Sequence, residues 1–226
     1  MPETSNVAPV DREPVDRELI AVVDPMCSWC WGFQPSLHKL AETFSATAPV
    51  SLLVGGLRPY SKTPMAEGMK DEIRHHWQHV QEASGQPFDF TFFDRDGFVY
   101  DTEPACRAVV TGRALDAGKV LGLLEAIQRG FYAEGRDVTE GTVLAELAAE
   151  AGYDGDAFRA EWESQIAKDL TRADFQASAN LGVNGFPTVV ARAGDSYAYA
   201  CVGYRPFEAL EPLVQGWING GREAAS

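Results

Sequence analysis

Two cysteines separated by two residues, Cys27 and Cys30, are the residues in this sequence best placed to do chemistry. Thiols at this spacing can close a small disulfide and exchange it with another thiol. The apolar run 19–23 precedes them and apolar side chains at helical spacing follow, which predicts a strand that gives way to a helix at the pair. The amides at a helix start stabilise negative charge and so favour the reactive thiolate of Cys27. We therefore expect Cys27 to be an exposed nucleophile and Cys30 a less accessible resolving thiol.

Four neighbours of the pair are expected to modulate it or to bind substrate. Trp29 and Trp31 flank the cysteines and offer apolar area to a substrate chain. The carboxylate of Asp24 would oppose a nearby thiolate, or alternatively relay a proton to Cys30. Ser28 and Trp29 form the dipeptide between the two thiols.

A pair of this kind also occurs in zinc sites, but those need two further ligands, and none is adjacent here. His75, His76 and His79 follow helical spacing, and we expect them on a solvated helix face. The sequence thus predicts no metal site and no nucleotide cofactor. The other two cysteines, Cys106 and Cys201, are expected to be buried packing residues.

Composition limits the classes of function. The chain has 226 residues, 45% of them hydrophobic, and can bury the core of one large domain or two small ones. A net charge of −14 disfavours nucleic acid and anionic membranes as partners. Residues 1–18 are polar, with no apolar signal segment, and no later stretch approaches the ~20 apolar residues of a membrane span. We expect a cytoplasmic protein with a flexible polar leader over residues 1–18.

The pattern along the chain predicts a helical block between two strand-containing segments. Gly55 and Gly56 are expected only to end a strand. The charged residues Glu103, Arg107 and Arg136 are expected to be solvated. The aromatic residues between positions 88 and 100 are expected to pack in the core. The predicted elements are strand 19–23, a helix after Cys27, strand 50–54, helices within 61–173, strands 188–191 and 197–202, and helix 207–217.

This order of elements, with two motifs, resembles the thioredoxin fold as elaborated in the DsbA family, where a helical domain is inserted between β-α-β and β-β-α halves. The motifs are the cysteine pair and segment 182–188, in which Phe186-Pro187 looks like the family's cis-proline loop. Segments 24–33, 102–108 and 131–137 are similar to cytoplasmic DsbA-family proteins related to FrnE. The resemblance implies an α/β fold with thioredoxin-like halves at 19–60 and 174–220 and an α-helical insertion at 61–173.

The resemblance also implies an activity, which is thiol–disulfide exchange as a reductase or isomerase. The substrate would be a protein or small molecule that carries a disulfide or thiol, and Phe186 and Pro187 would contact it beside the cysteines. The Ser28-Trp29 dipeptide matches neither periplasmic oxidases nor thioredoxins, so the redox direction stays open. Two alternatives remain: a glutathione-dependent isomerase or transferase of the 2-hydroxychromene-2-carboxylate isomerase or kappa-class type, with glutathione as co-substrate, and a peptide-binding or chaperone module. The oligomeric state is open.

Overall fold

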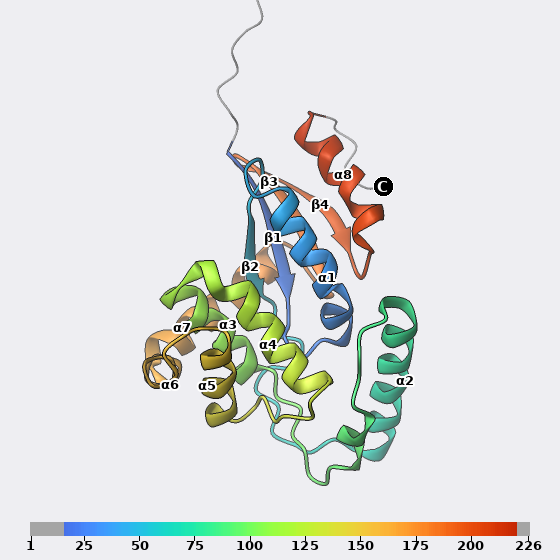
Figure 1. Ribbon diagram of the computed structural model, residues 1–226, viewed down its shortest axis with the longest axis vertical. Coiled ribbons are helices and arrows are strands. Elements are labelled where there is room, and N and C mark those ends of the chain that lie inside the picture. Colours follow the sequence, from blue (N-terminus) through green and yellow to red (C-terminus); the bar gives the residue numbers. More distant parts are fainter. Residues whose placement is uncertain (1–15, 221–226) are drawn as a thin grey trace, which may run out of the picture.

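A four-stranded mixed sheet forms the centre of the molecule in the computed structural model, which describes residues 16–220 (Figure 1). The strand order is β2-β1-β3-β4, with β2 parallel to β1 and the other two neighbours antiparallel. All four predicted strands are confirmed. Their bounds are β1 Arg17–Val23, β2 Val50–Val54, β3 Thr188–Ala193 and β4 Ser196–Val202.

The start of β1 corrects the expected boundary of the polar leader. Arg17 and Glu18 were assigned to the leader, but they pair with Ala193 and Arg192 of β3 in regular register. Arg192 also donates to the Glu18 carboxylate at 2.8 Å. Strand pairing therefore reaches two residues beyond the apolar run, and the rest of the predicted leader, 1–15, lies outside the described residues.

Two helices of the thioredoxin-like part pack against each other beside the sheet. These are α1 (Ser28–Thr43), which begins at the cysteine pair, and α8 (Phe207–Ile218), near the end of the described chain (Figure 1). α1 buries Phe33, Leu37 and Leu40 in the core. This helix positions the cysteines because its apolar face is fixed against the sheet.

A helical block separates β2 from β3, as expected, but its end differs from the prediction. The last of its helices runs through residue 173 to Asn180, so the expected boundary falls inside a helix. In Figure 1 the first helix of this block, α2, stands apart from the other helices of the block, beside the lower end of α1. The helices are α2 Glu67–Ser84, α3 Glu103–Leu115, α4 Val120–Tyr132, α5 Gly141–Glu150, α6 Gly155–Glu163 and α7 Gln165–Asn180, with short 3-10 turns η1 Phe90–Asp94 and η2 Ala117–Lys119.

The aromatic residues between 88 and 100 pack in the core, as predicted. They surround Trp77 of α2, which is fully buried, together with Phe131 and Tyr132 of α4. Ring centroids in this cluster lie about 5–6 Å apart, the range of favourable aromatic pairs. The cluster joins α2 to the rest of the insertion.

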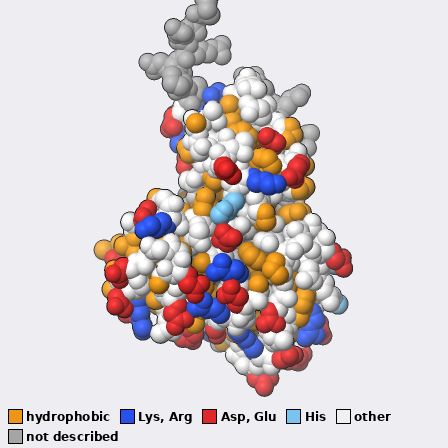
Figure 2. Space-filling view, viewed as in Figure 1, with side chains coloured by type: hydrophobic (Ala, Val, Ile, Leu, Met, Phe, Trp, Pro, Cys, Tyr) orange, Lys and Arg blue, Asp and Glu red, His pale blue; other side chains and the backbone are white. Residues whose placement is uncertain are grey.

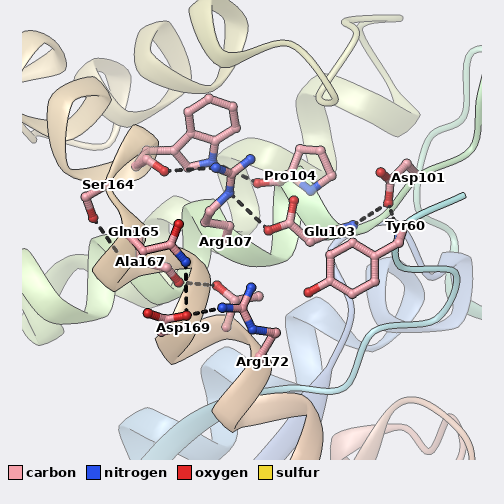
Figure 3. A network of polar contacts seen from close by, with 12 residues as sticks. Tyr60, Asp101, Glu103, Pro104, Arg107, Ser164, Gln165, Ala167, Asp169 and Arg172 are labelled. Atoms are coloured by element: carbon pink, nitrogen blue, oxygen red, sulfur yellow. Dashed lines mark hydrogen bonds and ion pairs between the residues drawn. The ribbon is translucent and has the colours of Figure 1, made fainter. Parts of the chain in front are cut away.

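The expectation that Glu103 and Arg107 are solvated is wrong. They are 7% and 8% exposed, and Arg107 lies 4.0 Å from the ring centroid of Trp162 in α6. Arg107 pairs with Glu103 at 3.1 Å (Figure 3) and donates to the Trp162 carbonyl. Trp162 in turn donates to the carbonyl of Pro104 at 3.0 Å. The packing of α6 on α3 covers both charges, and burial raises the pKa of Glu103.

Arg136 is paired as well, on a part of the surface where charges of both signs mix. It contacts Glu146 and Glu150 of α5 at 2.7 and 2.6 Å. Figure 2 shows acidic and basic side chains intermingled over the lower half of this face, where α4 and α5 lie. Within residues 16–220, no helix is long and apolar enough to cross a lipid bilayer.

Candidate active site

The cysteine pair lies where β1 gives way to α1, as predicted. β1 ends at Val23, and Cys27 occupies the N-cap position of α1, with its carbonyl accepting from the amides of Cys30 and Trp31. Both thiols are free, and Cys30 follows Cys27 by three residues, about one helical turn. Burial, together with the nearby Cys27 thiol, raises the pKa of the Cys30 thiol well above its ordinary value. The arrangement allows the two sulfurs to form a disulfide.

Cys27 is less exposed than expected. It is 6% exposed and Cys30 is 2% exposed, because the insertion and the loop before β3 close over the start of α1. Cys27 instead lines a cavity of about 210 Å³. The walls come from the start of α1, loop residues Leu57 and Arg58, α2, Tyr100 and Phe186. A partner that reaches the Cys27 sulfur must enter this cavity.

The Phe186-Pro187 peptide bond is cis, as the resemblance implied, and it lies beside Cys27. The Cys27 thiol donates to the Phe186 carbonyl at 3.5 Å. The phenyl ring of Phe186 packs so closely on Gly55 that a Cβ there would lie 1.9 Å from a ring carbon. Gly55 does more than end β2, therefore, because its lack of a side chain makes room for the loop that faces the nucleophile.

The two tryptophans have different environments. Trp29 lines the cavity and packs against Tyr204, with ring centroids 5.6 Å apart. Trp31 is 4% exposed, and its indole N–H donates to the Pro87 carbonyl at 3.0 Å. Trp31 is not among the residues that line the cavity, and its ring is covered by the insertion and stacks on Tyr132, so the expected substrate contact of Trp31 stays a prediction. Ser28 lies on the cavity wall beside Trp29.

Asp24 is completely buried beneath the cysteine pair. Its carboxylate accepts from the amides of Met26 at 2.8 Å and Leu57 at 2.6 Å, and from the thiol of Cys106 at 3.3 Å. Burial raises the pKa of Asp24 above its ordinary value, although these hydrogen bonds act in the opposite direction. The negative charge of Asp24 also raises the pKa of the Cys30 thiol. Burial of Cys106 and Cys201 is confirmed, but the polar contact of Cys106 was not predicted.

The guanidinium of Arg58 and the imidazole of His76 line the cavity. The main chain of Arg58 is held by Thr102, whose hydroxyl accepts from the Arg58 amide at 3.2 Å and whose amide donates to the Arg58 carbonyl. His76 is exposed, as predicted for that helix face. Sequence reasoning missed Arg58. Its position just after β2 could have indicated it. Parallel strands β1 and β2 end at the same edge of the sheet, so residues that follow β2 lie near the cysteines that follow β1.

Residues 18–215 match the model of the family described as "DSBA-like thioredoxin domain". The chain belongs to this family. Solved structures of similar chains agree with that assignment. A candidate protein disulfide isomerase from Nitrosomonas europaea is 39% identical, with a TM-score of 0.86 over 90% of this chain and 98% of that one.

Two further relatives of this DSBA-like chain differ in their described roles. The cytosolic disulfide reductase DsbM from Pseudomonas aeruginosa is 27% identical, with a TM-score of 0.74 over 89% of this chain and 98% of that one, and its structure with GSH is also known. The ClpXP adapter protein SpxH of Halalkalibacterium halodurans is 26% identical over 190 residues, 79% of this chain. The chain spans 59% of that adapter's length.

Proposed function

We propose that this DSBA-like protein is a thiol–disulfide oxidoreductase that works as a reductase or isomerase in the cytoplasm. One observation carries the proposal: the free thiol of Cys27 begins α1, lines a cavity opposite the Phe186 carbonyl, and has the Cys30 thiol within reach. The family membership and the similarity to DsbM support it.

The reaction has two exchange steps. The Cys27 thiolate attacks one sulfur of the substrate disulfide, a mixed disulfide forms, and the other substrate sulfur leaves with the electron pair and takes up a proton. Cys30 then attacks the Cys27 sulfur and releases the second substrate thiol. Because burial keeps Cys30 protonated, this step needs a proton acceptor, and Asp24 is the buried base beside it. Two further thiols return the Cys27–Cys30 disulfide to the dithiol.

The substrate side of the cavity suits an extended chain next to a cysteine. The main chain of Phe186 can pair with a short peptide segment, Pro187 keeps a side chain away from the thiols, and Trp29 offers an apolar surface. Arg58 adds a positive charge, which suits a carboxylate of a small thiol such as glutathione. The structure of DsbM with GSH supports glutathione as the reductant.

Reduction of insulin disulfides by the full chain, with glutathione as the reductant, tests this function. The Cys27→Ser variant should lose the activity. The Cys30→Ser variant should accumulate a mixed disulfide at Cys27 that mass spectrometry detects. Full activity in Cys27→Ser would refute the proposal. Activity that survives Cys30→Ser but requires glutathione would instead support the glutathione-dependent isomerase or transferase.

A second candidate function is peptide binding without turnover, which the similarity to the SpxH adapter favours. In that case the groove beside Pro187 would hold a client segment and the thiols would be dispensable. A variant with both Cys27→Ser and Cys30→Ser separates the two functions. Undiminished client binding by this variant, together with no insulin reduction by the natural sequence, would favour the adapter.

A further inference from the structure

Cys106 is a buried thiol that the exchange steps do not use. It lies in the first turns of α3, fully buried, and its thiol donates to Asp24 Oδ2 at 3.3 Å across 82 residues of sequence. Its pKa is raised mainly by burial, and the nearby main-chain amide of Gly56 acts in the opposite direction. The Cys106 thiol therefore connects α3 of the insertion with the loop after β2 and with the acid at the end of β1.

The start of α3 presents two side chains to Asp24. Thr102 and Cys106 are four residues apart, so they lie on the same helix face, and the Cys106 amide donates to the Thr102 carbonyl at 3.0 Å. The hydroxyl of Thr102 accepts from the Arg58 amide and also reaches the Asp24 carboxyl. The remaining donors to Asp24, Met26 and Leu57, use main-chain amides, which no substitution removes.

The groups on which the Asp24 charge acts come from several neighbouring elements. Cys30 belongs to α1, Cys106 to α3 and Tyr132 to α4, and Glu103 of α3 acts on Cys106. Tyr100 lies just before α3 and donates to the Met26 carbonyl at 2.7 Å. Cys106 differs from the others because its proton is directed at the carboxylate. Such a donor stabilises the ionised acid against the effect of burial.

We infer that Cys106 is a positioning residue, whose hydrogen bond holds the Asp24 carboxylate ready to accept the Cys30 proton during substrate release. The inference rests on the proposed exchange function. In that step the Cys30 proton moves to an Asp24 oxygen, the Cys30 sulfur bonds to the Cys27 sulfur, and the bond from Cys27 to the substrate sulfur breaks. The electron pair leaves on the substrate thiolate. Without the Cys106 donor, Asp24 holds its own proton to higher pH and accepts less often.

Stopped-flow reaction with the chromogenic disulfide dithiobis(nitrobenzoate) tests the inference. The first release of nitrothiobenzoate reports attack by Cys27, and the second reports release by Cys30. We expect Cys106→Ala to move the pH midpoint of the second phase upward by about half to one pH unit, the size of one lost weak hydrogen bond to a charge. Cys106→Ser keeps a donor and should restore the midpoint, and Cys201→Ala, another buried cysteine, should leave it unchanged.

The Asp24→Asn variant completes the test. Adding Cys106→Ala to Asp24→Asn should produce no further change, because the group that Cys106 positions is gone. Superimposable profiles for the natural sequence and Cys106→Ala would overturn the inference while leaving the exchange function intact. So would an equal shift in the Asp24→Asn background, or failure of Cys106→Ser to restore the midpoint. A second phase that persists in Cys30→Ser would instead refute the exchange function itself.

Discussion

The carboxylate of Asp174 in α7 accepts a hydrogen bond at 3.1 Å from the main-chain amide of Val54 in the edge strand β2. Edge strands leave such groups without a strand partner. Arg113 of α3 pairs with both Asp174 oxygens at 2.7 and 2.8 Å and donates to the Leu52 carbonyl at 2.7 Å. The helical insertion thus supplies the partners that a fifth strand would supply.

Asp174→Asn should destabilise the protein by about 2–4 kcal/mol, because it leaves the partly buried Arg113 without its counter-charge. Urea unfolding followed by circular dichroism measures the change. Asp169→Asn is the matched control on the same helix, since its exposed pair with Arg172 should contribute about 0–1 kcal/mol. Equal losses in the two variants would contradict this account of the sheet edge.

Trp29→Phe and Trp31→Phe should separate binding from stability. Trp31→Phe removes the hydrogen bond from the indole N–H to the Pro87 carbonyl and should lower the free energy of unfolding by about 1–3 kcal/mol. Trp29→Phe alters the cavity wall, so it should raise KM for insulin with little loss of stability. Steady-state kinetics and thermal unfolding of the two variants measure these effects. A raised KM in Trp31→Phe together with a loss of stability in Trp29→Phe would instead place the substrate surface on Trp31.

Gly55→Ala should impair exchange, because the new methyl group would displace the Phe186 ring and with it the carbonyl that faces Cys27. We expect at least about a tenfold fall in kcat/KM for insulin reduction, or about 1.4 kcal/mol. Gly68→Ala in α2 is the control, since nothing lies within 4 Å of a Cβ there and alanine favours a helix. Unchanged activity in Gly55→Ala would show that the loop tolerates the displacement.

Arg58→Gln should discriminate between charged and neutral disulfides. If Arg58 binds a carboxylate, KM for glutathione disulfide should rise about tenfold, which corresponds to about 1.4 kcal/mol. KM for the neutral hydroxyethyl disulfide should stay the same, because that substrate offers no carboxylate. Equal changes for both substrates would mean that Arg58 acts on the shape of the cavity instead.

Asp24→Asn should change how stability depends on pH. Burial raises the pKa of Asp24 above 3.8 in the folded state, so the folded protein binds this proton more tightly than the unfolded chain does. The stability from the protonated acid is complete below the unfolded pKa and is lost as pH rises through the folded pKa. The natural sequence should therefore lose stability relative to Asp24→Asn as pH rises from the unfolded pKa near 3.8 through the higher folded pKa.

Asp89→Asn provides a control of opposite sign. Hydrogen bonds from the Thr91 hydroxyl and amide lower the pKa of Asp89, so its contribution exists above the unfolded pKa and is lost as pH falls. Chemical unfolding at a series of pH values measures both slopes. Parallel slopes for the two variants would contradict the assigned direction for Asp24.

The sequence predicted most of the fold because local patterns determine most of its elements. The run 50–54 is continuously strand-like and is followed by Gly55, and β2 has those bounds. The burial of Trp31 and Arg107 could not be read in this way, because distant parts of the chain cover them: Pro87 and Tyr132 cover Trp31, and Trp162 of α6 covers Arg107. The same reason hid the contact between Cys106 and Asp24, which requires the orientation of α3 against the end of β1. The pair Cys27 and Cys30 was found because its positions are local.

The small exposure of Cys27 has a consequence for selectivity. A disulfide inside a rigid folded domain could not reach the buried sulfur of Cys27. A disulfide in a flexible loop or in a tripeptide could. Under the proposed exchange function, disulfides in flexible segments would therefore react and disulfides inside folded domains would not.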